Sequence, residues 1–73
     1  MMRFVIVAKP AAEGGALQYF CGDGFKPNLL HAARFRTEQD AQRRVRFSIH
    51  CRRMLESGAL IEVRRLSSAG KAD

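Results

Sequence analysis

The sequence has no continuous apolar run of the ~18 residues that a membrane-spanning helix needs. It begins with MMRFVIVAKP, which lacks the successive charged, apolar and small-residue regions of a signal peptide. We therefore expect an intracellular, cytoplasmic protein with no membrane partner.

Metal-ligating side chains are also scarce. Cys21, His31, His50 and Cys51 are the conventional zinc-ligand types, but they form no C-x-x-C pair. His50 and Cys51 are adjacent in a predicted helix, where their side chains point about 100° apart. We predict no metal site and no cofactor, and we expect two reduced, buried thiols in a cytosolic chain.

Catalytic signatures are absent as well. A cysteine–histidine pair would need a cleft and an oxyanion site, which a domain with one helix rarely provides. The glycines of Gly22 to Gly24 (GDG) do not lead directly from a strand into a helix, as a phosphate-binding fingerprint does, so they predict a sharp turn. We expect a protein that is not an enzyme.

Acidic residues are few, 7 against 13 lysines and arginines, and the formal net charge is +6. Most of the basic residues are arginines, whose guanidinium groups match phosphate and carboxylate geometry. The excess favours an anionic partner, either nucleic acid or an acidic protein surface. A merely solvated basic face, or the codon bias of a GC-rich genome, explains the same composition.

The 73 residues suffice for one small domain, which we place at 1–66, followed by a flexible polar tail at 67–73. A chain of this size buries only about 60% of the surface that its unfolded form exposes. The core is therefore thin, and an oligomer or a partner complex would complete it.

Several short segments have the β-branched or alternating pattern of strands. The predicted strands are Arg3 to Lys9, Ala16 to Cys21, His31 to Arg36 and Leu60 to Leu66, with an irregular segment from Phe25 to His31. The first is apolar on both faces, with Val5 and Val7 on one of them, which indicates a central strand or one whose second face is covered.

One long helix is predicted from Thr37 to Gly58. Thr37 is a good N-cap, Asp40 follows it at the capping-box spacing, and Gly58 supplies a left-handed C-cap. The expected fold is α+β, an antiparallel sheet of three to four strands in the order β-β-β-α-β, with this helix packed on one face.

The two sides of this helix differ in character. Its predicted solvent face contains Gln39, Gln42, Arg43, Arg46, His50 and Arg53. Its predicted core stripe contains Ala41, Val45, Ser48, Ile49 and Leu55, with a flank of Phe47, Cys51 and Met54. The apolar arc is wider than a globular helix needs, and Arg44 and Arg52 fall within or beside it, where a buried guanidinium must find a partner or reach solvent.

These patterns predict a partner-binding surface on the helix and the last strand. Its residues are Arg43, Arg46, Arg53, Phe47, Met54, Arg64 and Arg65. If the partner is nucleic acid, an exposed Tyr19 or Phe25 would add base stacking. The aromatic pattern of an RNA-recognition motif is absent, so we expect no specific base reading.

Three segments together resemble small phage and prophage proteins. They are YFCGDGF at Tyr19 to Phe25, AARFRTEQDA at Ala32 to Ala41 and IEVRRL at Ile61 to Leu66. Proteins of this size and origin include the anti-CRISPR inhibitors, which act without catalysis by covering Cas surfaces and blocking DNA access or subunit recruitment. The resemblance implies such an inhibitor in the cytoplasm of a bacterial host cell.

The positive charge departs from the acidic, DNA-mimicking members of that group. An inhibitor of this composition would instead direct its arginines at acidic patches of a CRISPR–Cas effector complex. Two alternatives stay open: a sequence-tolerant nucleic-acid-binding protein, and a homodimer that buries Val5 and Val7 across a two-fold axis.

Overall fold

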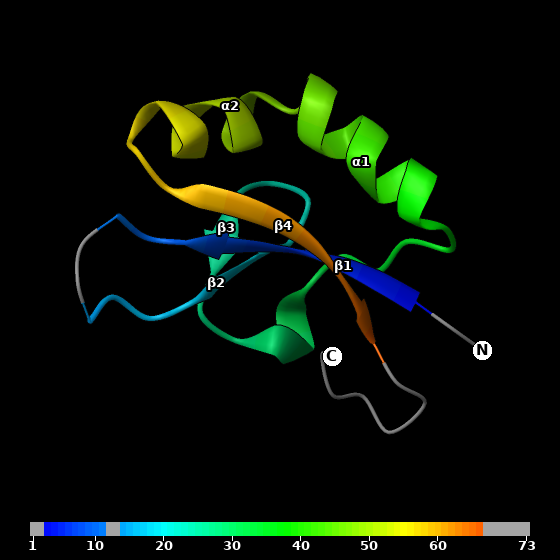
Figure 1. Cartoon of the computed structure of the whole chain (residues 1–73). Helices are drawn as coiled ribbons and strands as arrows, with labels where there is room; N and C mark the ends of the chain where they lie inside the picture. Colours follow the sequence, from blue (N-terminus) through cyan, green and yellow to red (C-terminus); the bar gives the residue numbers. More distant parts are fainter. Residues whose placement is uncertain (1–2, 12–13, 67–73) are drawn as a thin grey trace.

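A computed structural model describes residues 3–11 and 14–66 of the chain, so the predicted tail lies outside the described residues. The strands are β1 (Arg3–Lys9), β2 (Gln18–Phe20), β3 (Phe25–Lys26) and β4 (Leu60–Leu66). The helical elements are a 3-10 turn, η1 (Leu29–His31), and two α-helices, α1 (Glu38–Phe47) and α2 (Ile49–Glu56). Figure 1 shows both α-helices above the sheet.

The strands form one antiparallel sheet in the order β3-β2-β1-β4. The longest pairing joins β1 to β4 in a continuous register that runs from Arg3 opposite Leu66 to Lys9 opposite Leu60. The predicted α+β class, the element order and the bounds of the first and last strands are confirmed.

Both faces of β1 are buried within the chain. On one face, Ile6 and Phe20 pack with Ala41 and Cys51 of the helices. On the other face, Val5 and Val7 pack with Leu66 and with half-buried side chains that include Leu17, Tyr19, Leu29 and Ala32. The second face is therefore covered by the chain itself, through η1 and Ala32 and through the side chains of Leu17 and Tyr19 from the neighbouring strand region.

This second core contradicts one sequence-based hypothesis. Val5 is 0% exposed and Val7 is 1% exposed. Neither side chain has surface left for a second copy, so the predicted two-fold interface at these valines is wrong. The physical reason is that the irregular segment after β3 folds back under the sheet and covers them.

The third strand was predicted at the wrong place. Residues 31–36 form no strand. They meet the sheet through an isolated antiparallel bridge from Phe35 to Phe4 and a hydrogen bond of 2.7 Å from Ala33 N–H to the carbonyl of Phe20. The strand is instead Phe25–Lys26, because the turn at Gly22, which has a φ of 104°, returns the chain directly onto β2. Strand β2 is also shorter than predicted.

The predicted helical span is confirmed at both ends, but Ser48 divides it into two helices. Ser48 has extended backbone (φ −82°, ψ 129°), donates its N–H to the carbonyl of Arg44 at the end of α1, and accepts from Arg52 N–H at the start of α2. A continuous helix in phase with the buried Ala41 would turn Arg52 towards the sheet. The break instead leaves Arg52 in solvent and buries Cys51. Burying an uncharged thiol carries no free-energy penalty for removing a charge from water.

Because of this change in helical phase, the predicted core stripe is wrong in part. Ala41 is buried and Val45 is half-buried, as predicted, but Ile49 is 56% exposed and Leu55 is 48% exposed. On the predicted flank, Cys51 is buried and Met54 is half-buried, whereas Phe47 is 76% exposed. The sequence pattern assumed one helical phase, whereas two are present.

Both helix caps form as predicted. Thr37 Oγ1 accepts a hydrogen bond of 3.0 Å from Asp40 N–H. At the other end, Gly58 has a φ of 95° and donates to the carbonyl of Leu55, while Ala59 donates to that of Met54. This pair of bonds is a Schellman motif, which stops α2 and directs the chain into β4.

We expect Thr37→Ala to lower the free energy of unfolding by about 1 kcal/mol, because the N–H of Asp40 loses its acceptor. Chemical denaturation followed by circular dichroism measures the change. Thr37→Ser keeps the hydroxyl and should remain close to the original stability. Equal losses in both variants would show that the cap bond does not stabilise α1.

Candidate binding surface

The segment before α1 is fixed to the sheet by Phe35. Its N–H donates to the Phe4 carbonyl at 2.8 Å, and its carbonyl accepts from Phe4 N–H at 2.9 Å. Side chains alternate along extended backbone, so Arg34 and Arg36 turn outward while Phe35 packs against the core. Two exposed arginines are thus held beside the first turn of α1.

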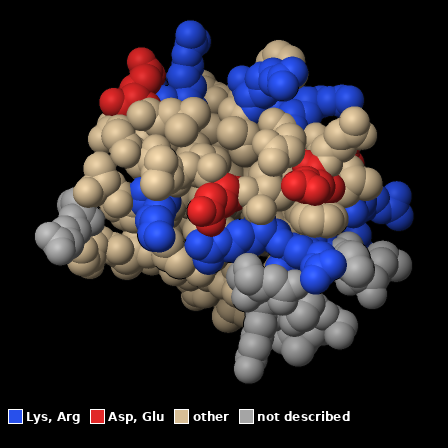
Figure 2. All heavy atoms as spheres, viewed as in Figure 1, with Lys and Arg blue, Asp and Glu red and all other residues tan. Residues whose placement is uncertain are grey.

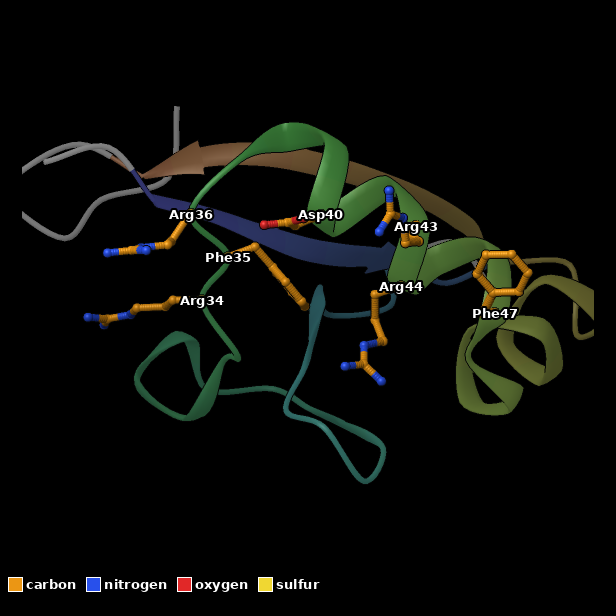
Figure 3. Close-up of a pocket in the computed structure, with 7 residues that line it drawn as sticks. All are labelled: Arg34, Phe35, Arg36, Asp40, Arg43, Arg44 and Phe47. Atoms are coloured by element: carbon orange, nitrogen blue, oxygen red, sulfur yellow. The ribbon is translucent and has the colours of Figure 1, made fainter.

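Helix α1 supplies the opposite side of a shallow pocket. Arg43 and Phe47 are four residues apart and therefore lie on one side of the helix. Together with Arg44 they line a pocket of about 520 Å³ whose other lining residues include Arg34 and Arg36. Figure 3 shows this arrangement, with Phe35 extending into the space between the two segments.

A second hollow of about 410 Å³ adjoins the first, because both are lined by Phe47. It lies at the break between the helices. We call the two hollows together the Phe47 surface, which is lined by Arg34, Phe35, Arg36, Asp40, Arg43, Arg44, Arg46, Phe47, Ser48, Ile49 and Arg52.

Positive charge on the Phe47 surface is poorly compensated. Asp40 is the one carboxylate among the side chains that line it. Among residues 3–11 and 14–66, the ion pair between two side chains is that of Arg64 with Glu62, which lies on β4 and outside this surface. Figure 2 shows basic side chains projecting from the helical layer with uncharged surface between them.

The guanidinium groups do not converge on one point. Figure 3 shows Arg34 and Arg36 extending side by side away from the helix, while Arg43 and Arg44 leave α1 in different directions. A site for one small anion would require donors aimed at a common position. This arrangement suits an extended anionic surface.

The predicted partner-binding residues fall into three places. Arg43, Arg46 and Phe47 lie on the Phe47 surface. Arg53 and Met54 line a separate hollow of about 320 Å³ beside Phe25.

The remaining two, Arg64 and Arg65, belong to β4. Arg64 alternates with Val63, which packs against the helical core, so Arg64 is on the sheet face away from the helices. Its Nη2 lies 2.9 Å from Oε2 of Glu62.

Neither aromatic residue predicted to stack on bases is fully exposed. Tyr19 is half-buried against the second core. Phe25 is also half-buried, and its ring meets that of Phe20 edge to face at a centroid distance of 5.5 Å. The exposed aromatic side chain is Phe47.

Sequence reasoning assigned three of the eleven surface residues to the site and missed the other eight. The eight are Arg34, Phe35, Arg36, Asp40, Arg44, Ser48, Ile49 and Arg52. Arg34 and Arg36 could have been found from the N-cap at Thr37, because residues just before a cap must run beside the first helical turn. Ile49 and Arg52 carried no such signal, since their exposure depends on the break at Ser48.

The turn after β2 contains a polar cluster outside the Phe47 surface. The thiol of Cys21 donates to Oδ1 of Asp23 at 3.1 Å and lies 3.3 Å from the carbonyl of Gly24. This thiol, the backbone of Asp23 itself, and the charges of Lys26 and His50 together lower the pKa of Asp23. Burial raises the pKa of the other thiol, Cys51, and both cysteines are free.

Within the described part of the chain, no three His, Cys, Asp or Glu side chains are grouped as metal ligands would be. None of the helices formed by those residues is both long and apolar enough to span a membrane.

Comparisons with protein-family models, with curated proteins and with solved structures found no match to this chain.

We expect Cys21→Ala to raise the pKa of Asp23 towards the ordinary aspartate value, because the strongest interaction that lowers it is lost. NMR titration of the Asp23 carboxyl measures the shift. Cys21→Ser keeps a hydrogen-bond donor at the same position and should cause a smaller change. An unaltered pKa in the alanine variant would contradict the thiol–carboxylate bond.

Proposed function

We propose that this chain is a non-enzymatic binding protein that places the Phe47 surface against an acidic surface of another protein. The observation that carries the proposal is the exposure of Phe47 (76%) and Ile49 (56%) among arginines that form no ion pair with a carboxylate of residues 3–11 and 14–66. Aromatic residues and arginine are the residue types enriched in the centres of protein interfaces.

The mixture of side chains favours a protein over nucleic acid as the partner. Protein–DNA interfaces are more polar and more strongly basic than protein–protein interfaces. The Phe47 surface exposes an aliphatic side chain, Ile49, and includes the carboxylate of Asp40, which would repel phosphates. An acidic protein surface offers carboxylates for the arginines and apolar contacts for Phe47 and Ile49.

Binding of this kind would act by occlusion. The resemblance to small phage proteins suggests the partner, a CRISPR–Cas effector complex of the bacterial host, in which the chain would block DNA access or the recruitment of a subunit. An exposed arginine surface complements acidic patches and accelerates association with them. In this proposal no residue of the chain acts as a catalyst.

A second candidate function is sequence-tolerant binding of single-stranded nucleic acid. One observation favours it: Phe47 is an exposed ring flanked by Arg43 and Arg46, and a base can stack on such a ring while arginines contact the adjoining phosphates.

The inhibitor proposal is tested with purified CRISPR–Cas effector complexes of several types, by measuring target-DNA binding and cleavage with and without the chain. We expect inhibition of one type, and we expect the double variant Arg36→Glu/Arg43→Glu to lose it by at least about tenfold, because two attractive charges become repulsive. Phe47→Ala should also weaken inhibition while leaving stability within about 0.5 kcal/mol, since the ring is exposed.

Lys9→Glu, compared with Arg43→Glu alone, is the control of equal charge change, because Lys9 is exposed on β1 and does not line the Phe47 surface. It should inhibit as the original chain does. The proposal fails if no effector type is inhibited, or if Lys9→Glu loses as much inhibition as Arg43→Glu.

The second candidate is tested by fluorescence anisotropy with a labelled single-stranded oligonucleotide across a salt series. Nucleic-acid binding predicts an affinity that falls steeply with salt and is reduced by about 1–3 kcal/mol in Phe47→Ala, the value of one stacked base. No binding at low ionic strength would remove this candidate. Salt-dependent binding that does not change in Phe47→Ala would be non-specific attraction to a basic protein.

A further inference from the structure

The two edges of the sheet differ greatly in length. At one edge, β3 comprises only Phe25–Lys26, which is too short to pair with another chain. At the other edge, β4 extends over the seven residues Leu60–Leu66. It contains no proline, and its charged side chains, Glu62, Arg64 and Arg65, are of both signs, so they can attract a partner of the same sequence as well as repel one.

The backbone of β4 presents hydrogen-bonding groups outward. Phe4 directs its N–H and carbonyl to Phe35, on the β2 side of β1. Along an antiparallel strand, the N–H and carbonyl of successive residues point to opposite sides. Val5 therefore directs its N–H and carbonyl towards β4, where Arg64 is its register partner. Val63, next to Arg64, therefore turns its N–H and carbonyl away from β1. No strand among the described residues pairs with that outer edge.

From this edge we infer that β4 pairs with the β4 of a second copy of this chain, antiparallel and centred on Val63, to form one continuous sheet across a two-fold axis. The inference is independent of the proposed function, because it uses the sheet edge and none of the residues of the Phe47 surface.

Charge selects the register. With Val63 opposite the partner's Val63, Glu62 faces the partner's Arg64, and symmetry creates the same pair a second time. Glu62 and Arg64 already form an ion pair within one chain, so pairing brings together four alternating charges on one sheet face. A register that placed Val63 opposite the partner's Ile61 would instead put the two Glu62 side chains together.

A two-fold axis of this kind runs perpendicular to the sheet, so both copies would present their helices on the same side. The two Phe47 surfaces would then belong to one helical layer above an enlarged sheet. The thin core of each chain would be extended without burying any arginine of the Phe47 surface.

The test is sedimentation equilibrium of the full chain over a wide concentration range, with Glu62→Arg and Arg64→Glu as variants. We expect a reversible dimer whose dissociation constant rises at least about tenfold in each variant, because like charges then face each other across the axis. Thermal melts followed by circular dichroism confirm that each variant is folded.

An equimolar mixture of the two variants separates pairing between chains from effects within one chain. Each variant has lost its internal ion pair, but in a mixed dimer the arginine introduced at position 62 of one chain faces the glutamate introduced at position 64 of the other. The mixture should therefore associate about as tightly as the original chain. The inference is overturned if the original chain is a monomer at every concentration, if neither variant weakens the dimer, or if the mixture associates no better than each variant alone.

Discussion

The burial of β1 on both faces is the constraint on which the rest of this structure depends. Each residue from Val5 to Ala8 is at most 1% exposed to solvent. A strand with two apolar faces must be covered twice, and a chain of this size has few segments with which to do so. The helices cover one face, while η1, the residues beside it and the side chains of Leu17 and Tyr19 cover the other. The irregular segment before α1 has no strong sequence pattern of its own, yet the burial of β1 depends on it as much as on the sheet.

The break at Ser48 connects this constraint to the candidate surface. A continuous helix across the sheet would have directed a charged residue, Arg52, into the core, and desolvating an unpaired guanidinium is costly. Dividing the helix brings Cys51 to the sheet and leaves Phe47 and Ile49 exposed at the junction. The apolar part of the Phe47 surface is therefore a consequence of how the core is closed. Its basic part arises in the same region, because Phe35 holds Arg34 and Arg36 against the start of α1.

Local chemistry made much of the fold predictable. The β-branched run of β1, the alternation of β4 and the caps at Thr37 and Gly58 act through neighbouring residues, and their elements occur where the sequence placed them. The third strand was misplaced because two residues, Phe25 and Lys26, become a strand only through the turn that returns them to β2. The candidate surface was predictable in part. Spacing along α1 identified Arg43, Arg46 and Phe47, but Arg34 and Arg36 join them only through tertiary pairing, and helical periodicity cannot anticipate a change of phase at one residue.

The pairing of β1 with β4 also affects how the chain is made. Arg3 lies opposite Leu66, so the central strand must wait for the last strand before its longest ladder can form. At ordinary rates of synthesis, the residues between them take roughly 3–12 s to be added. During that interval Val5, Ile6 and Val7 have no complete sheet to enter, and an apolar strand in that state is a target for chaperones and a starting point for aggregation. The sequence is short, but its longest ladder joins residues far apart in the chain, and such non-local contacts slow folding.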